Sequence, residues 1–344
     1  MYEKYYHLTG KPFQLNPDPG FYFASKGHNR AYSYLKYGVY QGEGFIVLTG
    51  EIGAGKTTMV RALMNDLDSA QIVAAQLIST QLEADDLLHA VSAAFGLPIK
   101  GLSKAEMLDQ FEQFLTRTTA AGKRALLVVD EAQNLSPGAM EELRMLSNFQ
   151  LGTRAMLQSF LVGQPELREI LRAPTMTQLR QRVIASYHLG PLAKDETRAY
   201  VLHRLDRVGW KGDPSISAKA FERLFDITGG VPRIINAVCD RMFLRASLDE
   251  KHALDVPEVD DTIKEMREEF GADTLRLDQP HLRDDRIGAR PVATAALAVR
   301  LERIERSVAQ AIDLLQQLAG QEPAPAKPAA PERRPRFGAR PDRP

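Results

Sequence analysis

A glycine-rich segment that follows a short apolar run is the first place where this sequence could do chemistry. The apolar run is Phe45-Ile46-Val47-Leu48, and a helical pattern begins at Lys56. Between them, the backbone N–H groups of the loop should form an anion-binding nest at the amino end of the helix. This strand, loop and helix predict a site for the phosphates of ATP. The expected contacts are Gly50-Glu51-Ile52-Gly53-Ala54-Gly55-Lys56-Thr57-Thr58.

An acidic pair is predicted to complete a metal site with the loop. Lys56 should reach the β- and γ-phosphates, and Thr57 should give its hydroxyl oxygen to Mg²⁺. Asp130 and Glu131 end the apolar run Leu126-Leu127-Val128-Val129, at the edge of a parallel sheet where ligands bind. Asp130 is predicted to hold Mg²⁺, and Glu131 to orient and polarise the attacking water. A pair of solvated loop acids is the alternative.

Two polar residues further along the chain could face the phosphates. Gln164 follows a fourth apolar run and could position water or sense the nucleotide, although a surface turn is the other interpretation. Arg233 follows Gly229-Gly230-Val231-Pro232 at the start of a helix, where proline suits the first turn. From there its side chain could reach across an interdomain cleft to the phosphates, with an ordinary capped turn as the alternative.

Arg180 and Arg182 lie just before the fifth expected strand, 185–189. In a ring or a filament, an arginine of one subunit can reach the γ-phosphate held by its neighbour and offset charge in the transition state. We predict this role for Arg182 ahead of Arg180, with solvated arginines as the alternative. The prediction makes the protein a homo-oligomer.

Strands and helices alternate between Phe45 and Pro191, which predicts a parallel sheet with right-handed crossovers. After Pro191 no strand is expected, and four helical patterns predict a small helical domain. Strands are expected at 45–48, 72–77, 125–129, 159–162 and 185–189. The expected divisions are an N-terminal segment that contacts the nucleotide (1–44), an α/β domain (45–191), a helical domain (192–270), a polar linker (271–291), an amphipathic helix (292–319) and a proline- and arginine-rich tail (320–344).

The amphipathic segment 292–319 repeats apolar residues at alternating spacings of four and three, which predicts a coiled coil or a partner-binding helix. A helix docked on its own domain is the alternative. The tail has too few apolar residues to bury a core and is expected to be disordered.

Composition and charge narrow the class of protein. The chain has 344 residues, with 44 Lys and Arg against 44 Asp and Glu, so its net charge gives no argument for nucleic acid or a membrane surface. Its single cysteine, Cys239, excludes an intrachain disulfide and is expected to be a buried apolar residue. No run approaches the roughly 18 apolar residues of a spanning helix, so we expect a cytoplasmic protein with no membrane span.

Taken together, the motifs resemble the AAA+ ATPase superfamily over about residues 1–270. More narrowly, the chain resembles the secretion ATPases of the general secretion pathway component A family, and looks like the compact ATPases of exosortase and exopolysaccharide loci. The motifs shared with that family are Gly10-Lys11-Pro12-Phe13, Pro17-Asp18-Pro19, Phe21-Tyr22-Phe23, Asp130-Glu131-Ala132-Gln133 and Phe160-Leu161-Val162-Gly163-Gln164-Pro165-Glu166-Leu167. Secretion members often continue into a membrane span and a cell-wall-binding domain, from which this chain departs, so the resemblance does not carry peptidoglycan binding.

The resemblance implies a five-stranded parallel sheet in the order 5-1-4-3-2, a C-terminal helical lid, adenine contacts from Phe23 and His28, and an ATPase that uses ATP and Mg²⁺. It implies coupling of nucleotide state to an envelope secretion or exopolysaccharide export system, whose components could contact residues 292–319. The alternative is a DNA-binding regulator or transposition ATPase, which the acidic stretch Glu258–Glu269 does not favour. A helicase would need a second motor domain, and a non-hydrolysing switch would not need Glu131.

Overall fold

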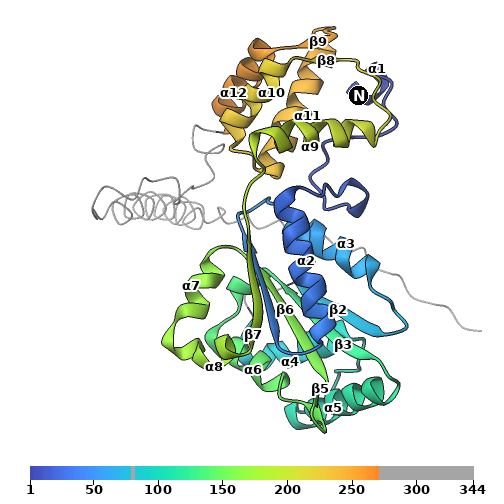
Figure 1. The fold of residues 1–344 in the computed structure, drawn as a ribbon, viewed down its shortest axis with the longest axis vertical. Helices are drawn as coiled ribbons and strands as arrows, with labels where there is room; N and C mark the ends of the chain where they lie inside the picture. The colour runs from blue at the N-terminus through green and yellow to red at the C-terminus, as the bar shows by residue number, and fades with distance from the viewer. Residues whose placement is uncertain (79–81, 271–344) are drawn as a thin grey trace, which may run out of the picture. The chain divides into compact units, whose positions relative to one another are not determined.

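A parallel five-stranded sheet carries the fold of the computed structural model, which describes residues 1–78 and 82–270 (Figure 1). Its strands are β1 (Phe45–Gly50), β2 (Ile72–Ile78), β3 (Arg124–Asp130), β6 (Leu157–Gly163) and β7 (Val183–Leu189). They lie in the order β2-β3-β6-β1-β7. The central strands β1, β3 and β6 are apolar along nearly their whole length because helices cover both faces of the sheet.

Two hydrophobic clusters fix the helices on the sheet. On one face, α2 (Lys26–Gln41) and α3 (Lys56–Asp66) bury Leu35 and Met59 against Leu48 and Val128. The other face packs against the helices α4 (Ala84–Ala94), α5 (Lys104–Ala120), α6 (Pro137–Leu146), α7 (Glu166–Arg172) and α8 (Thr177–Gln181). The short connecting elements are η2 (Ala132–Asn134), β4 (Gln150–Leu151), β5 (Arg154–Ala155) and η3 (Pro174–Met176).

Serine side chains begin several of these helices. Ser25, Ser103 and Ser136 each accept a hydrogen bond from a backbone N–H of the first turn, and the Glu106 side chain completes a capping box on α5. Gly42 ends α2 in the left-handed conformation. These local signals place the helix ends close to the positions that the sequence predicts.

The second part of the fold is a lid of four helices, α9 (Lys194–Asp206), α10 (Ala218–Thr228), α11 (Pro232–Leu248) and α12 (Val256–Phe270). Its core includes Cys239, which is fully buried, as expected. The expectation that no strand follows Pro191 is wrong, since β8 (Ser215–Ile216) and β9 (Ala253–Leu254) form a short parallel pair. Two-residue strands leave no periodic pattern in a sequence, which is why they were missed.

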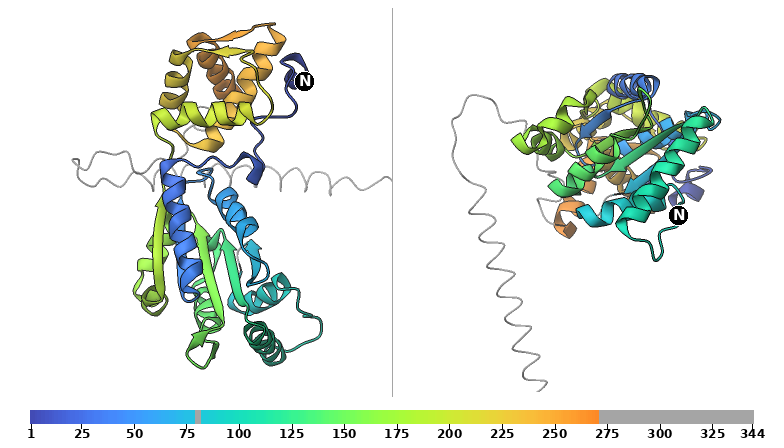
Figure 2. Two further views of the ribbon diagram at one scale, coloured as in Figure 1. Left: turned by 45° about the vertical axis from the view of Figure 1, so that its right-hand side comes forward. Right: turned by 90° about the horizontal axis from the view of Figure 1, so that it is seen from below.

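Residues 1–13 belong to the lid core rather than to the sheet. They include α1 (Tyr2–Tyr5), and their Tyr2, Tyr6 and Phe13 rings pack against Phe243 of α11. The hydroxyl of Tyr2 donates to Asp240 at 2.6 Å. Figure 2 (left) shows this dark-blue segment beside the orange lid helices.

All residues that the structure describes belong to one compact unit. None of their helices is both long enough and apolar enough to cross a membrane. The predicted linker (271–291), amphipathic helix (292–319) and tail (320–344) lie outside the described residues, and the boundary at 191/192 stays a prediction.

Candidate active site

The glycine loop lies between β1 and α3 and folds around the side chain of Lys56. Lys56 is buried, and its ammonium group donates to the carbonyls of Gly50 at 2.7 Å and of Glu51 at 3.0 Å. Burial lowers the pKa of Lys56 from its ordinary value, and the nearby carboxylates of Glu131 and Asp130 oppose that shift. The Lys56 ammonium group is therefore held at the loop by two carbonyls, where a bound anion would stabilise its charge.

The loop threonine and the strand-end aspartate meet, as a metal site requires. Thr57 donates its hydroxyl to the Asp130 carboxylate at 2.9 Å, and the N–H of Glu131 donates to the other carboxylate oxygen at 3.0 Å. Burial raises the pKa of Asp130, which is only 4% exposed. A hydroxyl and a carboxylate in contact are the hard oxygen donors that Mg²⁺ prefers, so these two residues fit the ion.

Glu131 is held in position by two glutamine amides. The side-chain amides of Gln133 and Gln164 donate to the same carboxylate oxygen of Glu131, at 2.6 and 3.1 Å. Gln133 also accepts from the backbone N–H of Gln164 at 3.0 Å. Glu131 has a φ of 54°, a left-handed conformation that is uncommon outside glycine and that turns the chain just after β3. The carboxylate is therefore fixed by both its backbone and its partners.

Arg233 joins the lid to the glycine loop. Its backbone N–H donates to the carbonyl of Gly53 at 3.2 Å, and a Cβ at Gly53 would lie 2.2 Å from the Cβ of Arg233. Only glycine allows this close approach. The φ of 81° at Gly53 is a second reason why glycine is needed here. The Arg233 guanidinium has no hydrogen-bond or ion-pair partner within the described ranges, and it lines the cavity described next.

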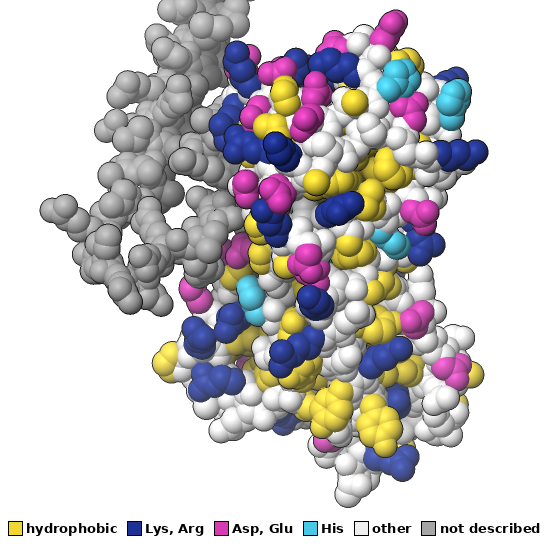
Figure 3. Space-filling model, turned by 45° about the horizontal axis from the view of Figure 1, so that its top comes forward, with side chains coloured by type: hydrophobic (Ala, Val, Ile, Leu, Met, Phe, Trp, Pro, Cys, Tyr) yellow, Lys and Arg dark blue, Asp and Glu magenta, His cyan; other side chains and the backbone are white. Residues whose placement is uncertain are grey.

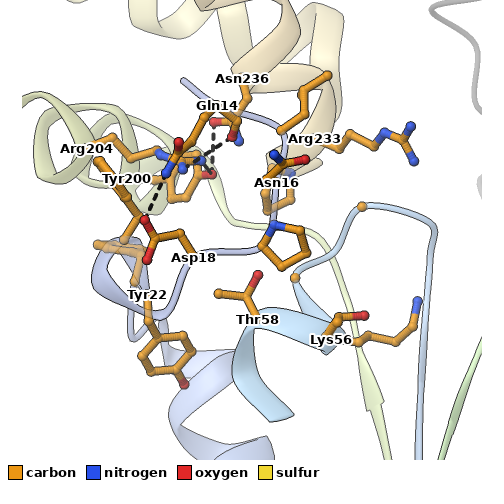
Figure 4. A pocket seen from close by; sticks show the side chains of 18 of the residues that line it. Gln14, Asn16, Asp18, Tyr22, Lys56, Thr58, Tyr200, Arg204, Arg233 and Asn236 are labelled. Carbon is orange, nitrogen blue, oxygen red and sulfur yellow. Dashed lines mark hydrogen bonds between the residues drawn. The ribbon is translucent and has the colours of Figure 1, made fainter. Parts of the chain in front are cut away.

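A cavity of about 390 Å³ extends from the glycine loop to the lid and the N-terminal segment (Figure 4). Its lining includes Lys56, Thr57, Thr58, Ile52 and Glu131 on the phosphate side. On the far side it is lined by residues 14–18 and 21–23 of the N-terminal segment, by Tyr200 and Arg204 of α9, and by Arg233 and Asn236 of α11. Both predicted adenine contacts, Phe23 and His28, lie in this lining.

His28 supports the loop. Its Nε2 lies 3.1 Å from the carbonyl of Ala54, and its Nδ1 lies 2.8 Å from the Ser25 hydroxyl. Burial lowers the pKa of His28, which favours the neutral ring, and the Ala54 carbonyl places the proton on Nε2. The Nε2 contact supports the loop, and the Ser25 contact orients the ring. Phe23 packs its ring on Tyr200 and His203, with centroids 5.7 and 5.5 Å away.

The two candidate arginine fingers lie away from this cavity. Arg182 stands just before β7, where its carbonyl accepts from the N–H of Phe45 and its guanidinium donates to Ser147 at 2.8 Å. Arg180 donates to the carbonyls of Leu171 and Arg172. Because Phe45 and Gly50 are opposite ends of β1, these arginines are far from the loop of their own chain. Their role in a neighbouring site stays a prediction.

Several residues of the site carry no sequence signal of their own. Gln133 belongs to a motif noted in the sequence, but its spacing from Glu131 does not predict that the two side chains meet. Three further residues, Tyr200, Arg204 and Asn236, come from two lid helices, and only the apolar residues around them at helical spacing indicate that they are buried. Gln14 lies in an irregular segment where no period operates.

Comparison with known proteins finds similar sequences for most of the chain. Residues 39–171 match the family model of the AAA domain. The chain is 39% identical to the general secretion pathway protein A of Aeromonas hydrophila over 255 residues, which is 74% of this chain. The match spans about half of that relative's length, 46%.

Solved structures show the same fold at low identity. The ORC2 protein of Aeropyrum pernix, solved as ADPNP-ADP complexes, has a TM-score of 0.57 at 17% identity, covering 74% of this chain and 71% of that one. Cdc6p of Pyrobaculum aerophilum has a TM-score of 0.58 at 19% identity, covering 75% and 71%. The chain therefore has the α/β P-loop fold of these solved structures, and it is similar in sequence to the AAA domain and to general secretion pathway protein A.

Proposed function

We propose that this chain binds ATP with Mg²⁺ and hydrolyses it to ADP and phosphate. The observation that carries the proposal is one constellation: Thr57 meets Asp130 next to Lys56, while Glu131 is held beside them by Gln164. Thr57 and Asp130 would hold Mg²⁺, which supplies positive charge to the phosphate oxygens when bound. The other loop residues are proposed to bind the phosphates, Gln164 to position water or sense the nucleotide, and Phe23 and His28 to contact the adenine.

In the proposed reaction, the chain's own groups divide the work. Lys56 leaves its backbone carbonyls for the β- and γ-phosphates, and the loop N–H groups bind the same oxygens. Glu131 orients a water molecule and takes its proton as the water oxygen bonds to the γ-phosphorus. The bond from the γ-phosphorus to the bridging oxygen breaks, and ADP leaves with the electron pair. Arg233, and Arg182 of a neighbouring subunit, offset the charge that develops.

Two substitutions separate binding from hydrolysis. Lys56→Ala should abolish ATP binding, whereas Glu131→Gln should keep binding and lower kcat by roughly 100-fold or more. Lys219→Ala and Glu112→Gln remove exposed charges of α10 and α5 and serve as controls. Unchanged turnover in Glu131→Gln would overturn the assigned hydrolysis.

The nucleotide cycle is proposed to drive assembly or operation of an envelope secretion system from the cytoplasmic side of the inner membrane. The similarity to general secretion pathway protein A supports this. A narrower proposal is an exopolysaccharide system of an exosortase locus, and it rests on the sequence motifs alone. The proposal that components of this system contact residues 292–319 also rests on the sequence alone. A strain that carries Glu131→Gln should lose export, and full export there would separate ATP turnover from secretion.

The DNA-binding alternative has less support. Within residues 192–270, two surface arginines pair with acids: Arg223 with Asp260, and Arg245 with Asp261 and Glu265. Figure 3 shows basic and acidic side chains interspersed over the upper part of one face. Such a surface lacks the single-sign field that attracts phosphate backbones. Stimulation of ATP turnover by duplex DNA at moderate salt would reverse this preference.

A further inference from the structure

The nucleotide cavity contains a buried cation that the hydrolytic site does not use. Arg204 of α9 is 5% exposed and forms no ion pair with any carboxylate among the described residues. Its Nε is buried and has no hydrogen-bond partner. A buried guanidinium without an anion is unfavourable for the fold, so its presence in this cavity points to a role other than stability.

The contacts of Arg204 lie on two different parts of the chain. Within the lid, it donates to the Tyr200 hydroxyl at 2.8 Å, and Tyr200 in turn donates to Asn236 of α11 at 2.9 Å. Towards the N-terminal segment, its guanidinium lies 4.9 Å from the Phe21 ring centroid and donates to the carbonyl of Gln14 at 3.5 Å. Figure 4 shows the side chain directed at this meeting point.

We call residues 14–23 the strap, because they connect the lid core to the sheet. Residues 1–13 are anchored in the lid, and α2 is anchored on the sheet. Between these anchors the strap has only the short helix η1 (Pro19–Phe21). Its residues 14–18 and 21–23 line the cavity opposite the glycine loop. A nucleotide with its phosphates in the loop therefore places its nucleoside against the strap.

We propose that Arg204 is a positioning residue that holds the strap over the nucleoside of bound nucleotide and so slows nucleotide release. The proposal rests on the proposed function, because it assumes that the cavity holds ATP and ADP. Arg204 acts on the nucleoside half of the cavity, where the strap is its neighbour, and not on the phosphates. Its planar guanidinium lies near the Phe21 ring and donates to Gln14, a combination that lysine reproduces only in part.

The test measures release of a fluorescent ADP analogue from the full chain by rapid mixing. Arg204→Met should accelerate release about ten-fold, the loss of one hydrogen bond from a charged donor. The KM for ATP should rise by more than kcat falls. Tyr200→Phe, which keeps the ring and loses the hydroxyl, should have an intermediate effect. Arg204→Lys should restore part of the retention. Arg207→Met, at an exposed arginine one turn further on, is the matched control.

Inorganic tripolyphosphate, which has no nucleoside, tells strap control from general damage. Its inhibition constant should stay within about two-fold of wild type in Arg204→Met, because the loop that binds it is intact. Equal weakening of tripolyphosphate and ADP, or wild-type ADP release in all three variants at positions 200 and 204, would overturn the proposal. If Arg204→Met fails to fold, Arg204→Lys and Tyr200→Phe decide. Failure of wild-type protein to bind ADP would instead refute the proposed function.

Discussion

Glu131 combines an uncommon backbone conformation with a carboxylate held by two amides. A left-handed non-glycine residue costs about 1–3 kcal/mol, and such residues gather at functional sites because the surrounding structure fixes them there. Here the neighbours that fix it are Gln133 and Gln164, which bond both to Glu131 and to each other. The glutamine pair therefore belongs to the proposed catalytic unit.

Removing either glutamine should slow hydrolysis more than it weakens binding. Gln133→Ala and Gln164→Ala each remove a donor from Glu131, and we expect kcat to fall about 10- to 100-fold in both, because positioning of the base is lost. Steady-state ATP turnover and ATP affinity measure the two effects. Gln113→Ala, at an exposed glutamine of α5, is the control, and an equal loss of affinity would contradict the assignment.

Asp130→Asn should stabilise the nucleotide-free protein while abolishing activity. Burial raises the pKa of Asp130, so its proton is bound more tightly in the folded chain than in the unfolded one. The stability that this gives is present below about pH 4 and is lost as the pH rises through the folded-state value. At pH 7 the substitution removes the cost of burying the charge, and we expect Tm to rise.

Thermal unfolding as a function of pH checks this. The Tm difference should disappear toward pH 4, and Asp109→Asn at an exposed aspartate should show no gain. A lower Tm for Asp130→Asn at neutral pH would contradict the assigned cause.

At the scale of residues, the loop, the acid pair and Gln164 could be predicted from the sequence. Each directly follows an apolar strand, and the end of a parallel strand fixes where the next residues lie. Gln133 could not be placed, since a residue two positions after Glu131 can face any direction until the turn is known. Arg204 was missed because charged residues on helices usually face water.

At the scale of elements, the start of α11 is where the lid contacts the glycine loop. Gly53 and Arg233 come together so closely that a side chain at position 53 cannot be accommodated. The strands of the sheet could be predicted from short, mainly apolar segments that alternate with helical patterns. The approach of lid to loop was not, because it depends on packing between segments far apart in the chain.

Gly53→Ala should therefore separate the lid from the loop. The added methyl would meet the Cβ of Arg233, which cannot swing away, and we expect the KM for ATP to rise at least ten-fold. Gly96→Ala is a matched control, since Gly96 has a similar φ of 75° with open space around it. Both variants should lose about 1 kcal/mol from the left-handed backbone, measured by denaturant unfolding. Equal ATP kinetics in the two would show that the contact is not required.

Within residues 1–78 and 82–270, three apolar clusters hold the sheet and the lid, and residues 1–13 complete the lid cluster. From the sequence, the entire N-terminal segment is expected to contact the nucleotide. The sequence does not separate residues that pack in the lid core from residues that contact a base, because aromatic side chains suit both environments.

Phe13→Ala should weaken the lid. Phe13 is 1% exposed, and its ring meets Phe243 edge-on at 5.3 Å. Its truncation should lower the free energy of unfolding by about 3 kcal/mol. Tyr40→Ala, at a tyrosine that is 82% exposed, should change it by less than about 0.5 kcal/mol in the same denaturant titration. Similar values for both would place Phe13 outside the core.

Complementation between subunits tests the arginine finger. Arg182→Ala alone should reduce turnover by about 10³-fold if the arginine completes a neighbour's site. A mixture of the Arg182→Ala and Glu131→Gln variants should regain activity. At some interfaces the first variant then supplies an intact Glu131 and the second supplies an intact Arg182. Arg180→Ala is the comparison, and rescue by that variant would move the role to Arg180.

The bond between Tyr2 and Asp240 joins positions that are 238 residues apart. During synthesis, the first segment emerges long before its partners on α11 exist, and its aromatic side chains must wait unburied. Closing so long a loop is slow, and exposed apolar surface in that interval favours association with other chains. The lid core can therefore close only after α11 has been synthesised, whereas all five strands of the main sheet precede α11 in the chain.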